Sequence, residues 1–230
     1  MGMKNFLAGA ARIADSRAPR WLLKAEKWFG WIAIPNLAIL LITLQVGGFI
    51  FVNYQPEWAL QLALLPDAAL AGEYWRFITF LALPLSTSPI WFLFVLMFVY
   101  MIVNLLEQEW GAFRTTLYVL VSWVLTVGFS VATGYPVLSA EHFESSLFLA
   151  AAMLYPEMPI SLFFVIPAKM KWLAGVSIAF VVLEMIQGSW LDRFHILAIY
   201  SNVILFFGPA ALFNLRAWIS RKRWDRNSKS

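Results

Sequence analysis

The stretch EYWRFIT, residues 73–79, stands in front of an apolar segment that the stretch EQEWG, residues 107–111, brings to an end. Because a desolvated guanidinium without partners costs several kcal/mol, on the order of the penalty for any buried ion, Arg76 needs hydrogen-bond acceptors. We therefore expect Arg76 to be bonded to loop carbonyls or to a carboxylate. The pattern predicts a helix that crosses a membrane, with an embedded arginine at one end and a glycine turn at the other.

The composition is that of an integral membrane protein. Hydrophobic residues make up 61% of the 230 residues and charged residues only 13%, whereas a soluble domain carries about 25% charged residues. There is no cysteine, which excludes disulfides and thiolate chemistry. The net charge is +4, but the basic residues flank apolar spans, so we predict no nucleic-acid partner.

Hydropathy predicts an all-helical membrane protein with six spans. The fourth span is short, about 20 Å against a hydrocarbon thickness of about 30 Å. The loop 53–73 is apolar and is expected to form short interfacial helices, and Ile160–Ile166 is also expected to lie in the interface. The predicted spans are Trp31–Val52, Pro89–Leu106, Thr115–Thr133, Phe143–Tyr155, Trp172–Gln187 and Phe194–Phe213.

The distribution of Lys and Arg residues along the chain predicts its orientation in the membrane. Residues 1–30 are interpreted as a cytoplasmic, interfacial amphipathic segment, 31–214 as the membrane domain and 215–230 as a basic cytoplasmic tail. With both termini inside, only Arg76 and Arg193 of the 17 Lys and Arg residues lie outside, as the positive-inside rule favours. The composition of the chain is typical of a bacterial inner-membrane protein. The lipid bilayer is therefore its first expected partner.

The turn after the second predicted span carries Glu107, Glu109 and Arg114. Glu107 lies near the negative end of a helix dipole, where a lone carboxylate is unfavourable, so Arg114 is expected to pair with it across the turn. Gly111 suits the left-handed residue that ends helices.

The order of these signals resembles the rhomboid superfamily over residues 30–214. Trp75-Arg76-x-x-Thr79 is similar to its Trp-Arg motif, and Glu107-x-x-x-Gly111 followed by Arg114 is similar to the turn closing its second helix. A short fourth span ending Tyr155-Pro156 resembles that family's connection to its fifth span. The resemblance implies a six-helix fold with these motif residues as its structural or functional signature: Trp75, Arg76, Thr79, Glu107, Gly111 and Arg114.

The catalytic parts of active rhomboids are missing. They carry Gly-x-Ser-Gly at the start of span four, a histidine on span six, and a His/Asn pair early in span two. Here no Gly-x-Ser-Gly occurs, the region 141–147 reads EHFESSL, and Trp91 and Val95 stand near the His/Asn positions. The resemblance thus implies a non-catalytic scaffold, similar to rhomboid pseudoproteases and derlins, that binds transmembrane segments of client proteins. A short fourth span and an interfacial first loop would thin the bilayer through mismatch and favour short or polar clients.

Two alternatives stay open. A serine protease with a displaced dyad would use Ser145 or Ser146 with His195, although serines also cap helices and His195 could pair with Glu184 or Asp192. A small transporter would need a polar path, and only a few polar residues could line one. These intramembrane residues are Gln45, Asn104, Glu184 and Asn202. Two histidines and no cysteine predict no metal site, and no cofactor is expected.

Overall fold

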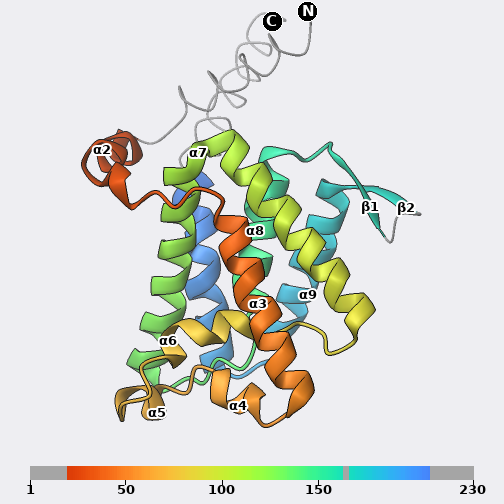
Figure 1. The fold of residues 1–230 in the computed structure, drawn as a ribbon. Coiled ribbons are helices and arrows are strands. Elements are labelled where there is room, and N and C mark those ends of the chain that lie inside the picture. Colours follow the sequence, from red (N-terminus) through yellow and green to blue (C-terminus); the bar gives the residue numbers. More distant parts are fainter. Residues whose placement is uncertain (1–19, 163–165, 208–230) are drawn as a thin grey trace, which may run out of the picture.

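The computed structural model describes residues 20–162 and 166–207, and these are mostly helical (Figure 1). Four of the described helices are long and apolar enough to cross a membrane. The coarse prediction of a helical membrane protein is therefore confirmed. The four are α3 (Leu37–Tyr54), α7 (Pro89–Thr133), α9 (Met170–Gln187) and the helix Trp190–Phe207.

Helix α7 is two helices joined at a break. Gly111 has φ 81° and ψ 163°, which is not helical, and the chain turns back there (Figure 1). The positive φ agrees with the expected turn glycine. Its ψ is a correction, because the residue occupies the extended mirror region open only to glycine, not the left-handed helical region. The two arms, 89–110 and 112–133, each run further into the turn than the predicted spans.

The first long helix begins later than predicted. The chain enters through α2 (Arg20–Phe29) and the 3₁₀ turn η1 (Gly30–Ile32), and α3 starts only at Leu37. The predicted span begins at Trp31, six residues before the start of α3. Asn36 precedes the helix with φ 57°, and this left-handed residue interrupts the helical path.

Short helices form the predicted interfacial loop. They are α4 (Trp58–Leu62), α5 (Pro66–Leu70) and α6 (Arg76–Thr79), followed by the 3₁₀ turn η2 (Phe80–Ala82). They lie at the end of the bundle opposite to α2 (Figure 1). Gly48 of α3 lies directly against the backbone of Ala82, so that η2 is held on the bundle.

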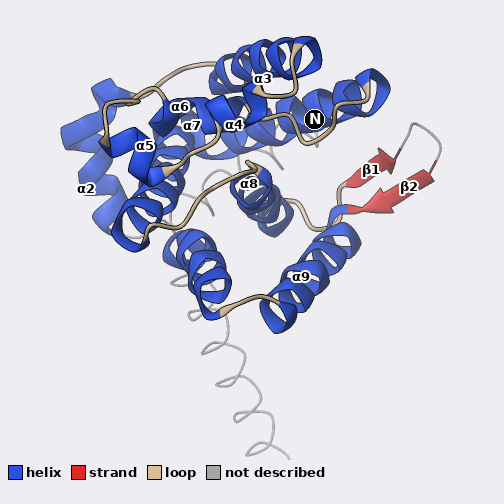
Figure 2. Ribbon diagram, turned by 90° about the horizontal axis from the view of Figure 1, so that it is seen from below, coloured by secondary structure: helices blue, strands red, loops and turns tan. Residues whose placement is uncertain are grey.

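Helix α8 (Glu141–Leu154) is the central element, with the longer helices around it (Figure 2). Ala150, Ala151 and Ala152 are all buried, as their small size allows close helix packing. Tyr155, which ends the helix, donates to Glu109 at 2.7 Å. This contact joins the end of α8 to the turn of α7.

A β-hairpin spans the segment predicted to lie in the interface, within a described chain that is otherwise mostly helical. Strands β1 (Pro159–Leu162) and β2 (Ile166–Lys169) pair antiparallel, with Pro159 opposite Lys169. Glu157 at its base accepts from Lys169 at 2.8 Å and Lys171 at 2.5 Å. The predicted residues 1–19, 208–214 and 215–230 lie outside the described part of the chain.

Candidate functional site

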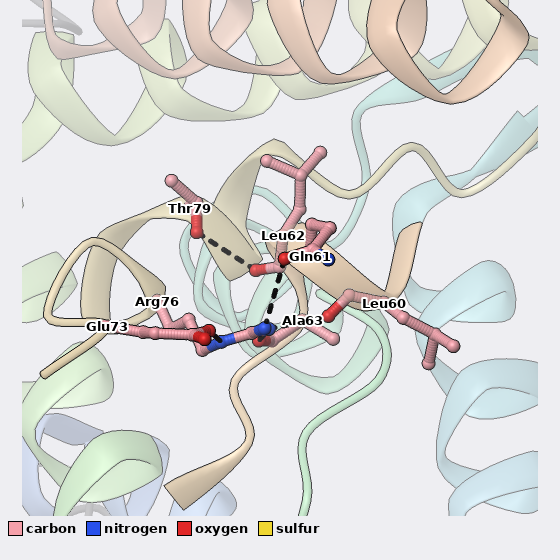
Figure 3. A network of polar contacts seen from close by, with 7 residues as sticks. All are labelled: Leu60, Gln61, Leu62, Ala63, Glu73, Arg76 and Thr79. Carbon is pink, nitrogen blue, oxygen red and sulfur yellow. Dashed lines mark hydrogen bonds and ion pairs between the residues drawn. The ribbon is translucent and has the colours of Figure 1, made fainter. Parts of the chain in front are cut away.

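Arg76 is the centre of a polar network that holds the loop between α3 and α7 (Figure 3). Its side chain is buried, and Nη1 donates to the carbonyl oxygens of Leu60 at 2.5 Å and Ala63 at 2.8 Å. Nε donates to Glu73 Oε2 at 2.5 Å. Both predicted kinds of acceptor are therefore present, loop carbonyls and a carboxylate.

The other residues of this motif extend the network. Thr79 Oγ1 donates to the Leu62 carbonyl at 3.0 Å, so it fastens α6 to the end of α4 (Figure 3). Trp75 precedes α6 and is exposed. Trp123, on the second arm of α7, donates its indole N–H to the Phe77 carbonyl at 2.6 Å. The motif thus fixes a loop backbone rather than building a reactive centre.

At the opposite end of the bundle, Arg114 and Glu107 each bond to a partner other than the predicted one. Arg114 donates to Glu26 of α2, from Nε at 3.2 Å and from Nη2 at 3.1 Å. Glu107 Oε1 accepts from the backbone N–H of Asn36 at 2.9 Å. The sequence named neither partner, because α2 and the segment before α3 come to lie across the α7 turn only in the folded chain.

The serines of α8 are inside the helix and bonded to other groups. Ser145 Oγ lies 3.0 Å from Ser177 Oγ of α9. Ser146 Oγ donates to the Phe143 carbonyl at 2.8 Å and lies 3.3 Å from Ser122 Oγ of α7. Neither caps the helix, whose N-cap residue is Ala140, so the predicted capping role was wrong.

His195 is buried against His142 of α8, and no hydrogen bond joins it to either serine. Only 3% of the residue is exposed, and neither ring nitrogen has a hydrogen-bond partner among the described residues. Its ring centroid lies 4.5 Å from that of Tyr135, 5.5 Å from Phe129 and 5.6 Å from His142. The Ser–His dyad of the alternative reading is not formed in this conformation.

The carboxylates expected near His195 have other partners. Glu184 pairs with His142, with its Oε1 3.2 Å from His142 Nε2. Asp192 accepts from the Tyr135 hydroxyl and from the Ser189 backbone N–H, both at 2.7 Å. Burial first, and then the hydrogen bond and charge of Asp192, raise the pKa of Tyr135 to about 12. The tyrosine is therefore a permanent donor at ordinary pH.

Further polar contacts cross the bundle interior. Asn202 donates to the Tyr118 carbonyl at 3.0 Å, and the Tyr118 hydroxyl donates to the Ser146 carbonyl at 2.9 Å. Gln45 of α3 donates to the carboxyl group of Glu144. Asn104 is half-buried on α7 and forms no side-chain hydrogen bond within the described residues.

Sequence reasoning missed several members of this interior polar group. In the run EHFESSL, the absence of the Gly-x-Ser-Gly motif and the two serines were the only features used for prediction. Glu144 of this run accepts a hydrogen bond from Gln45 across the bundle. The spacing of the polar residues could have indicated this group. Glu144 and Ser145 follow Glu141 by three and four residues, so all three lie on one face of a helix. Ser122 and Ser177 carried no signal, since isolated serines in apolar spans are common.

The arrangement positions hydroxyls and amides but activates none of them. In the described ranges no serine hydroxyl bonds to a histidine or carboxylate base, and no three His, Asp or Glu residues are placed to bind a metal. No family model matches the chain, and no curated protein matches it either.

Proposed function

We propose that this protein is a rhomboid-like membrane scaffold that binds transmembrane segments of other proteins without cleaving them. Its six spans would be α3, the two arms of α7, α8, α9 and the helix beginning at Trp190. The break at Gly111 supports counting α7 twice. Helix α8 has 14 residues, about 21 Å, and would cross a bilayer that is locally thin.

Both termini would be cytoplasmic, in a bacterial inner membrane. The support is the distribution of basic residues between the two ends of the bundle. Lys24 and Lys27 lie in α2, and Lys169 ends β2, at the end shared by α2 and the hairpin (Figure 1). Arg76 belongs to α6 at the opposite end. Positive charge gathers on the inner side of membrane proteins, which makes the α2 end the inner one.

The binding face would be α9, and its exposure is the observation that carries the proposal. The main contacts of α9 are with α8 and β2, and Met170 is its one buried residue. Large apolar side chains lie exposed along it, among them Phe180 at 67% and Ile186 at 65%. A helix with so little packing against its own bundle can exchange lipid contacts for contacts with a client helix at little cost.

Polar groups between α8 and α9 would let the protein select among client helices. The hydroxyls of Ser145 and Ser177 meet between α8 and α9, and Glu184 on α9 meets His142. A client helix with a polar residue could bond to such groups, which lipid cannot do. The short α8 favours a short client for the same reason that it favours a thin bilayer.

The test uses two synthetic transmembrane peptides in nanodiscs, one all-leucine and long, the other shorter with a central asparagine. A photo-crosslinking residue replaces Phe180 or, as a control, Ile204, which is 69% exposed on the last helix. We expect adducts at position 180 that prefer the short polar peptide, and few at position 204. Equal yields at both positions, or no preference between peptides, would contradict the proposal.

An intramembrane serine protease is the second candidate. One observation favours it: His195 has two buried ring nitrogens without a partner among the described residues, and its ring lies against His142, three residues before Ser145 on α8. A dyad would require the histidine and a serine of α8 to come into hydrogen-bond contact, which this conformation does not show. A fluorophosphonate probe decides the matter. Labelling that disappears in Ser145→Ala or Ser146→Ala would establish the protease, and absence of labelling favours the scaffold.

A further inference from the structure

A cavity of about 210 Å³ lies between the first arm of α7 and α8. Its wall is apolar, with Phe98, Val99 and Ile102 from α7 and Leu147 and Phe148 from α8. This is more than the roughly 150 Å³ of an engineered apolar cavity that takes up benzene. The space therefore accommodates an aromatic ring or a short alkyl chain.

The cavity continues toward the outer end of the bundle. A second hollow, about 470 Å³, lies among the end of α3, the segment before α7 and the segment before α8. Leu85 and Glu141 line both hollows, so they meet at these two residues. The outer hollow has more polar walls, including Thr87 and Ser139. The two hollows are therefore adjacent at the start of α8.

Two carboxyl groups mark this path. Glu141 lies where the hollows meet, and Glu144 lines the inner cavity one helical turn further on. Within the described residues, no lysine, arginine or histidine forms an ion pair with either of them. The N-terminus of α8 accounts for part of their tolerance, because a helix dipole favours acids in its first turn.

The dipole of α8 does not explain why the amide oxygen of Gln45 is buried without a hydrogen-bond donor. Its Nε2 donates to Glu144, but its Oε1 is buried and has no donor among the described residues. Buried acceptors are almost always bonded, and an unsatisfied one indicates a missing donor. Gln45 lines neither hollow, but its amide group contacts Glu144, which lines the inner one.

We propose that the cavity binds a small amphiphilic cation, of the arylalkylammonium class. The ammonium group would lie between Glu141 and Glu144 and donate to Glu144 and Gln45 Oε1. The ring or chain would occupy the space between Val99 and Phe148. An ammonium has three donors and a charge, which match an unsatisfied acceptor and two carboxyl groups without a basic partner. The proposal does not rest on the binding of client helices.

The test is binding of 2-(4-fluorophenyl)ethylammonium to the full-length protein in nanodiscs of zwitterionic lipid, followed by ¹⁹F line width. Empty nanodiscs give the blank for partition into lipid. The matched neutral probe is 2-(4-fluorophenyl)ethanol, which has the same ring and one donor. We expect saturable binding of the ammonium at one site per protein, and for the alcohol only the signal of the blank.

Three variants locate the site. Glu144→Gln keeps the size and a hydrogen-bonding group, and is expected to weaken binding about tenfold or more through loss of a charge-assisted bond. Val99→Phe fills the cavity and is expected to abolish binding. Glu157→Gln, an acid outside the cavity, should bind as the wild type does. Thermal unfolding verifies that each variant is folded.

Three outcomes would overturn the proposal: no saturable binding above the blank, equal binding of the alcohol, or unchanged affinity in a folded Glu144→Gln variant. If Val99→Phe does not fold, the affinity of the folded Glu144→Gln variant for the ammonium still tests the proposal.

Discussion

Nη1 of Arg76 lies 2.8 Å from the carbonyl oxygen of Ala63, and both residues are buried. Ala63 extends the chain directly after α4, and Arg76 begins α6. One guanidinium therefore satisfies the carbonyl groups at which a short helix ends. Such carbonyls have no helical partner and, when buried, need a donor from elsewhere.

Replacement of Arg76 by alanine should unfold the outer loop first. The carbonyls of Leu60 and Ala63 would lose their donor, and Glu73 its cation. Breaking a buried pair in this way costs about 3–5 kcal/mol. We expect a large fall in the thermal unfolding midpoint in detergent, followed by tryptophan fluorescence. Lys27→Ala, an exposed cation on α2, is the control, and equal midpoints for the two variants would contradict this role.

Adjacent glycines of α3 should respond in opposite ways to alanine. A Cβ at Gly48 would lie 1.8 Å from the Ala82 carbonyl oxygen, so α3 and η2 would have to separate. Overpacking of this kind costs about 1–3 kcal/mol or more. A Cβ at Gly47 meets nothing within 4 Å, and Gly47→Ala should be neutral or stabilise by up to about 1 kcal/mol. Unfolding midpoints of the two variants measure this, and a stable Gly48→Ala would show that the α3–η2 contact is wrong.

Gly111→Ala tests the break in α7 through backbone strain alone. A Cβ there meets no atom within 4 Å, but φ 81° and ψ 163° are costly for any L-residue. The expected destabilisation is about 1–3 kcal/mol. Gly128→Ala, in the helical second arm and equally free of neighbours, is the matched control and should not destabilise. If Gly111→Ala were as stable as that control, the chain would not turn at residue 111.

The hairpin base should loosen in acid. Hydrogen bonds from Lys169 and then Lys171 lower the pKa of Glu157 from 4.5 to about 2. Because the folded pKa is depressed, this contribution is complete above about pH 4.5 and is lost as the pH falls toward 2. Amide hydrogen exchange of β1 and β2, corrected for intrinsic rates, should rise over that window. The Glu157→Gln variant should lack the change, and an unaltered pH profile in that variant would exclude Glu157 as the cause.

Much of the fold was predictable because it follows from local hydropathy. The ends of α9 and the short helices of the first loop agree with the prediction, since each depends on an apolar run bounded by Pro, Gly or charge. Arg76 was predictable in the same way. A buried guanidinium requires acceptors whatever the fold, and the nearest backbone was the loop before it.

The parts that failed depend on chain segments far apart in the sequence. Glu26 is 88 residues from Arg114, and no local pattern indicates that α2 returns to the α7 turn. The sequence predicts that residues 160–166 are apolar and lie in the interface, but it does not predict a β-hairpin at 159–169. A short apolar run does not distinguish a strand from another interfacial segment. The bonding of Ser145 to Ser177 and of Gln45 to Glu144 likewise requires the packed bundle.

The central claim, that this bundle holds a client helix and leaves it whole, is tested most directly by the mass of a captured peptide. The short polar peptide is crosslinked at position 180 on α9, and the mass of the intact adduct is measured. We expect the full-length peptide joined to the full-length protein. Truncated peptide with a new terminus, formed only when Ser145 and Ser146 are intact, would contradict it.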